Sequence, residues 1–153
     1  MKRTLVMFFF LSFSLCVSTI VLAQDFSSLI EKAEETVKTK NPSLDLASKR
    51  QVTDKEVVYQ FGSAKDGIRL LVFYGASEKE AAERMNFFIS HISVGPDKKL
   101  EGIGDEAYLW KSHGDGFGAI RFRKSNVFID LVAPSVAMAE DLARSLADLI
   151  PGK

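Results

Sequence analysis

Apolar residues recur at helical spacing in three segments of the chain. The first segment, residues 26–38, ends at Asn41-Pro42. The second begins at Ser77, where Glu80 three residues later completes a capping box. The third follows Pro134. The apolar sides of these three helices consist of Phe26, Leu29, Ile30, Ala33 and Val37; of Ala81, Met85, Phe88, Ile89 and Ile92; and of Ala139, Leu142, Ala143, Leu146, Leu149 and Ile150.

Between the helices, the apolar and polar positions alternate as in strands. Residues 44–52 show the weakest strand pattern, whereas the runs at residues 56–62 and 67–75 are rich in β-branched and aromatic residues and are bounded by Gly. The segment "AKDG" between the last two runs is typical of a hairpin turn. Residues 101–131 supply three more strands. The sequence therefore predicts a helix followed by two βββα halves. This order indicates an α+β domain, with an antiparallel sheet and helices packed on one face.

The register of the last three strands can be tested with two loop assignments. A two-residue turn at Lys124-Ser125 pairs Arg121 with Phe128, and a four-residue loop at residues 113–116 pairs Tyr108 with Arg121. Both assignments give the same partition between the two faces of the sheet. One face is wholly apolar and must be core: Leu109, Ile120, Phe122, Val127, Ile129 and Leu131. The other carries Tyr108, Trp110, Ala119, Arg121, Arg123, Phe128 and Asp130.

The second face is the candidate recognition surface. Aromatic rings beside a guanidinium bind ligands through cation–π contacts and flat stacking. The candidate binding residues are Tyr108, Trp110, Arg121, Phe128 and Asp130. Two alternatives stand beside this hypothesis. The apolar stripe of the helix at residues 26–38 can lie across the same face, or two copies of the chain can meet there in a homodimer.

The first 23 residues have the three-part layout of a signal peptide. Lys2 and Arg3 precede an uncharged apolar stretch, and Val-x-Ala ends it, so we expect cleavage after Ala23 and a single α+β domain over residues 24–153. The alternative is an uncleaved anchor, because residues 4–23 are just long enough to span a bilayer. A membrane association is expected only in that case.

Removal of the signal peptide changes the cysteine count and the net charge. Cys16 is the one cysteine of the chain, so the exported domain has no disulfide and no thiol chemistry. Of the 20 Lys and Arg residues, the loss of Lys2 and Arg3 leaves 18 against 20 Asp and Glu, a net charge of −2. An acidic balance argues against a nucleic-acid partner, since such proteins carry a basic surface.

Candidate catalytic chemistry is sparse. His113, Gly114, Asp115 and Gly116 are typical of a turn, because Gly tolerates positive φ and Asp bonds to its own backbone. No spacing brings further ligands to His113 and Asp115, so neither a metal site nor another cofactor is expected. The alternative is an envelope-acting hydrolase that uses His113 and Asp115 at the loop end of the sheet.

The stretch "GIGDEAYLW", with "GAIRFRKSNVFIDL" and "AEDLARSLADLI" after it, resembles a pattern in small bacterial secreted proteins and lipoproteins of unknown function. In those proteins a Gly-[Leu/Ile]-Gly-Asp-Glu-Ala strand precedes an Arg-Lys-Gly-Asn hairpin and a terminal Ala/Leu-rich helix. The pattern is similar in general plan to extracytoplasmic sensor-type domains. Ser125 stands where Gly is commoner, which implies a different turn. The resemblance brings no active-site residues and implies a bacterial, exported, non-catalytic protein.

These observations together predict a binding or interaction domain of the bacterial periplasm or cell envelope. Its partner is an unidentified protein or small ligand of the envelope.

Overall fold

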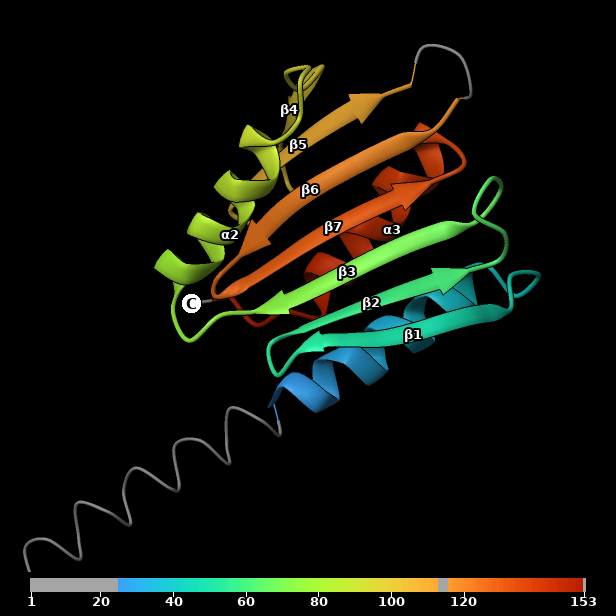
Figure 1. The fold of residues 1–153 in the computed structure, drawn as a ribbon, viewed down its shortest axis with the longest axis horizontal. Coiled ribbons are helices and arrows are strands. Elements are labelled where there is room, and N and C mark those ends of the chain that lie inside the picture. Colours follow the sequence, from blue (N-terminus) through green and yellow to red (C-terminus); the bar gives the residue numbers. More distant parts are fainter. Residues whose placement is uncertain (1–24, 113–115, 153) are drawn as a thin grey trace, which may run out of the picture.

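A seven-stranded antiparallel sheet forms the centre of the molecule (Figure 1). The computed structural model describes residues 25–112 and 116–152. The strands follow the order β1-β2-β3-β7-β6-β5-β4. With three helices packed against this sheet in the described residues, the predicted α+β class is confirmed.

The six predicted strands are all present, and a seventh was not predicted. The strands are β1 (Leu46–Thr53), β2 (Glu56–Phe61), β3 (Ile68–Tyr74), β4 (Lys98–Leu100), β5 (Glu106–Lys111), β6 (Gly118–Lys124) and β7 (Val127–Ala133). Because β4 is only three residues long, it is too short to show alternation in the sequence. It pairs with β5 and makes the second half ββββα rather than βββα.

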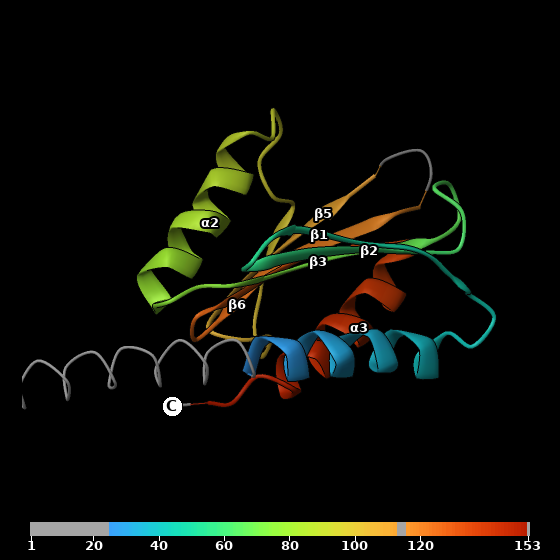
Figure 2. The same ribbon diagram turned by 60° about the horizontal axis from the view of Figure 1, so that its bottom comes forward.

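The helices cover both faces of the sheet, whereas the sequence predicted one face (Figure 2). The N-terminal helix, described over residues 25–40, and α3 (Val136–Asp148) lie on one side, and α2 (Glu78–Ser90) lies on the other. The reason is in the central strands, which are apolar on both faces. In β3, Leu70 and Val72 face the first two helices, while Leu71 and Phe73 pack with α2.

The main core lies between the sheet and the two helices of the first side. It includes every residue that the register argument assigned to the core face: Leu109, Ile120, Phe122, Val127, Ile129 and Leu131. Tyr59 fastens the N-terminal helix to the sheet, since its hydroxyl donates to the carbonyl of Ile30 at 2.9 Å. The N-terminal helix therefore does not cover the face that carries Trp110 and Arg121, which was one of the alternatives.

The turn between β6 and β7 lies one residue later than predicted. Ser125 and Asn126 form it, so Arg121 pairs with Asp130 and Arg123 with Phe128, whereas the sequence paired Arg121 with Phe128. Ser125 adopts a left-handed φ of 52°. Asp105 holds it there, because its Oδ2 accepts from the Ser125 amide at 2.7 Å. This moves the pairing by two residues, so the assignment of side chains to the two faces is unchanged.

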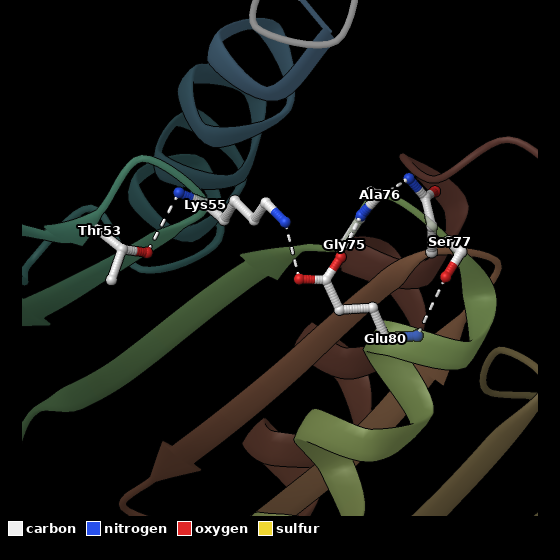
Figure 3. A network of polar contacts seen from close by, with 7 residues as sticks. Thr53, Lys55, Gly75, Ala76, Ser77 and Glu80 are labelled. Atoms are coloured by element: carbon white, nitrogen blue, oxygen red, sulfur yellow. Dashed lines mark hydrogen bonds and ion pairs between the residues drawn. The ribbon is translucent and has the colours of Figure 1, made fainter.

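A polar network fixes the start of α2 (Figure 3). Ser77 accepts from the Glu80 amide at 3.2 Å, as the predicted capping box requires. The Glu80 carboxylate reaches one residue further back than in the usual box and accepts from the Ala76 amide at 2.6 Å. Its second oxygen accepts from Lys55 at 2.7 Å, in the turn between β1 and β2. The helix is thus tied to a turn of the sheet as well as capped.

The signal peptide predicted for residues 1–23 lies outside the described residues. Among residues 25–112 and 116–152, no helix combines the length and the apolar character needed to cross a bilayer.

A candidate binding hollow beside Trp110 and Arg121

The five candidate residues lie on the α2 side of the sheet, on three neighbouring strands. Tyr108, Arg121 and Asp130 form a single cross-strand row, because Tyr108 pairs with Arg121 and Arg121 with Asp130. Trp110 follows Tyr108 on the same face of β5, and their rings lie edge to face with centroids 6.3 Å apart. The predicted pairing of β5 with β6 is confirmed.

Asp130 is the buried acid of this face, with 1% of its surface exposed. Its Oδ2 accepts from Nη2 of Arg69 at 2.9 Å. Its Oδ1 lies 3.1 Å from Nε of Arg121, but the N–H is not directed at the oxygen, so the two atoms form an ion pair without a hydrogen bond. Two guanidinium groups thus share one carboxylate, and the cluster carries a net charge of +1.

The guanidinium of Arg121 is enclosed on two sides. Its central carbon lies 4.6 Å from the centroid of the Trp110 ring, in a cation–π contact. Burial is the main cause that lowers the pKa of Arg121, and the charge of Asp130 opposes it. An arginine remains charged under such a shift. The hydrogen bonds among the described residues include none from this guanidinium.

Trp110 is itself mostly covered, with 9% of its surface exposed. The segment after α2 passes over it, and its indole Nε1–H donates to the carbonyl of Val94 at 3.0 Å. The open aromatic face expected from the sequence is therefore much reduced.

Phe128 does not reach the surface at all. It is fully buried under α2, where its ring lies 5.2 Å from that of Phe88 and packs with Leu71, Phe73 and Met85. Phe128 anchors the helix, and a ligand can contact it only if α2 moves.

A shallow hollow of about 270 Å³ remains open next to the covered residues. It exists because Ala119, opposite Trp110 on β6, has too short a side chain to fill the space above the sheet. Its lining is Ile92, Trp110, Lys111, Ser112, Phe117, Ala119 and Arg121. The hollow thus combines apolar walls with one enclosed guanidinium and one exposed lysine.

Tyr108, which belongs to the same cross-strand row, is half-buried, and its hydroxyl already forms a hydrogen bond. It donates to a Glu106 carboxylate oxygen at 2.9 Å, and this hydrogen bond is the main cause that raises the pKa of Tyr108. Tyr108 therefore contacts Trp110 through its ring, while its hydroxyl is occupied by the hydrogen bond to Glu106 on the same strand.

A second buried ion pair, between α2 and the sheet, was not predicted. Arg84 donates through Nε to the buried carboxylate of Glu56 at 2.8 Å. Its guanidinium also lies 4.9 Å from the ring centroid of Phe88. Only one signal for this pair exists in the sequence, an arginine inside the otherwise apolar stripe of the helix, and that signal names no partner.

Arg69 and Val94 were also missed. Arg69 lies on β3, which is far from β7 in the sequence but next to it in the sheet, so its contact with Asp130 requires the strand order. Val94 contributes a backbone carbonyl, which no side-chain pattern reveals. The lysine at the hollow, Lys111, ends β5.

His113 and Asp115, the residues of the hydrolase alternative, lie outside the described residues. Within residues 25–112 and 116–152, no group of three or more His, Cys, Asp and Glu side chains is placed to hold a metal ion. Comparisons with models of protein families, with curated proteins and with solved structures found no match for this chain.

Proposed function

We propose that this chain is a non-catalytic binding domain that is exported to the bacterial periplasm or cell envelope and recognises a partner or ligand through the hollow beside Trp110 and Arg121. One observation carries the proposal. An arginine side chain with 10% of its surface exposed is enclosed against a tryptophan ring at the wall of an open hollow. Enclosed guanidinium and indole groups are the residue types that dominate recognition sites.

The chemistry of the hollow favours binding over catalysis. Arg121 and Lys111 donate hydrogen bonds but do not accept protons at neutral pH, and Trp110 donates its indole N–H to Val94. The described lining thus lacks a general base, whereas catalysis needs nucleophile, base and stabilising donors to converge. The hydrolase alternative predicts instead that His113→Ala abolishes an activity and leaves the fold intact.

A fragment screen tests the binding site. Trp110 is the one tryptophan of the chain, so its indole N–H gives a single NMR signal. We expect compounds from a chemically mixed set to move this signal in the purified protein, and the variant Ala119→Leu, which fills the hollow, to lose the response. Ala47→Leu, on the exposed strand β1, is the matched control for the same added apolar side chain. Compounds that bind only elsewhere would contradict the proposal.

Export has its own test. The full chain, with a tag only at its C-terminus, is expressed in a bacterium. The cells are then fractionated, and the mass of the intact protein is measured by mass spectrometry. We expect the protein in the envelope or periplasmic fraction with Gln24 as its first residue. Full-length protein retained in the membrane would favour the anchor, and protein in the cytoplasm would remove the export part of the proposal.

A further inference from the structure

We infer that the hollow binds a monocarboxylate with an apolar body, which Arg121 receives through its two Nη groups. The inference rests on the proposed function and deepens it, because it names the chemical class of the ligand.

The orientation of Arg121 leaves one side of the guanidinium for a ligand. Its Nε edge faces Asp130 at 3.1 Å, and one flat face lies against Trp110. Nε is buried without a hydrogen bond. The remaining donors are the N–H groups of Nη1 and Nη2, and Arg121 belongs to the lining of the hollow. Arginine binds a planar carboxylate in this way, with two parallel hydrogen bonds.

The local charge favours a monoanion. Arg69 and Arg121 share Asp130, so the cluster has one positive charge in excess. A carboxylate with one negative charge neutralises it. A phosphate dianion would leave negative charge in excess, close to the buried Asp130, and Lys111 is too exposed to offset much of it.

The walls determine the rest of the ligand. Ile92, Trp110, Phe117 and Ala119 supply apolar surface around the charged group. A volume of about 270 Å³ fits one ring or a short aliphatic chain, but not a large cofactor. Both a free organic acid and the C-terminal carboxylate of a peptide with an apolar last residue present this chemistry.

The test compares benzoate with benzamide, its neutral analogue of the same shape. Each is titrated into the purified protein, and the Trp110 indole N–H signal is followed by NMR. We expect benzoate to move the signal saturably, with a Kd at least tenfold lower than that of benzamide, because only benzoate carries the charge that pairs with Arg121. 3-Phenylpropanoate, a free acid, and an N-acetylated dipeptide ending in Phe, which adds the peptide backbone to the same ring and carboxylate, distinguish the free acid from the peptide terminus.

Two variants and one control complete the design. Arg121→Lys keeps the charge but loses the paired donors, and we expect at least fivefold weaker benzoate binding. Ala119→Leu leaves Arg121 in place and removes binding of both compounds. Arg50→Lys, on the exposed strand β1 at the opposite edge of the sheet, should bind benzoate as the original chain does.

The outcomes separate the inference from the proposed function. Equal binding of benzamide and benzoate would overturn the inferred preference for a carboxylate and leave the hollow as an apolar site. Inorganic phosphate that competes as well as benzoate would overturn the monoanion preference. If neither benzoate nor benzamide moves the signal while other fragments do, the inference fails and the proposed function stands. If no compound of any class moves it, both fail.

Discussion

Gly104 shows how one residue determines the local path of the chain. It adopts a φ of 60°, and a Cβ there would lie 2.4 Å from the carbonyl oxygen of Arg123. The approach is this close because the next amide, that of Asp105, donates to the same oxygen at 2.8 Å. The buried Ile103 precedes it and Asp105 holds the β6–β7 turn. The Gly-Ile-Gly-Asp segment is therefore a structural junction.

Gly102 provides a matched comparison for Gly104. It has a similar φ of 71°, but a Cβ there would meet only the tip of the Arg144 side chain at 3.4 Å. We expect Gly102→Ala to lower the free energy of unfolding by about 1 kcal/mol, through the backbone conformation alone, and Gly104→Ala by about 3 kcal/mol, because the backbone must also shift. Urea unfolding measures both. Equal losses would show that the close contact with Arg123 relaxes without cost.

Asp130 carries the electrostatics of the α2 side of the sheet. In Asp130→Asn, the enclosed Arg121 and the half-exposed Arg69 lose their shared negative charge. We expect the free energy of unfolding to fall by about 2–4 kcal/mol, because a charge is left in a desolvated position without a partner. Asp66→Asn, in the exposed turn before β3, is the control and should change stability by less than about 0.5 kcal/mol. A small effect of Asp130→Asn would mean that water replaces the carboxylate.

At the scale of elements, the start of α2 is sensitive to pH. The hydrogen bond from Lys55 and then that from the Ala76 amide lower the pKa of Glu80 below its ordinary value of 4.5. A lowered pKa in the folded state means that Glu80 stabilises the fold above the pKa of the unfolded chain. This stabilisation is lost as the pH falls through the folded value.

The variant Glu80→Gln isolates this contribution. We expect it to be less stable than the original chain at pH 7, and we expect the difference to shrink as the pH falls below 4.5, so the two stability curves converge on acidification. Urea unfolding at a series of pH values measures this. Glu83→Gln, whose 3.7 Å pair with Lys79 is exposed, should follow the original curve. Parallel curves for Glu80→Gln and the original chain would contradict the role of the carboxylate.

The elements could be predicted from the sequence to the extent that local patterns determine them. The alternation along β5 and β6, together with the assignment of a four-residue loop after Ser112, predicted the pairing that these two strands adopt. The β6–β7 turn was placed one residue early because Asp105, which holds the Ser125 amide, comes from a distant segment. The assignment of side chains to the two faces of the sheet stayed correct despite this error, because the pairing moved by two residues.

At the scale of the whole molecule, the sheet separates two cores of unequal size. The smaller one, under α2, consists of Leu71, Phe73, Ala81, Met85 and Phe128. Helix α2 buries Ala81 and Met85, while α3 buries five residues in the main core. We expect the amides of α2 to exchange with solvent at least tenfold faster than those of α3, as a local opening with lower free energy. Equal protection factors, measured by hydrogen exchange with NMR, would show that the two helices open together.

The candidate site was predicted only in part, for reasons that belong to this scale. The sequence placed Tyr108, Trp110, Arg121, Phe128 and Asp130 on one face. It did not show that α2 covers Phe128 or that Val94 passes over Trp110, because both depend on how distant elements pack. On β7, the apolar residues Phe128 and Val132 share this face with Asp130, and such a pattern indicates that the strand is buried on both faces.

The central pairing of the sheet joins parts of the chain that are made at different times. Arg69 and Asp130 are 61 residues apart in the sequence. Their strands, β3 and β7, are neighbours, and β7 is the central strand of the sheet. A loop of that length closes late, so contacts of this kind slow folding. While a ribosome still holds the last strands, β3 lacks its neighbour β7 on one side. The sheet is therefore completed only after β7 has emerged.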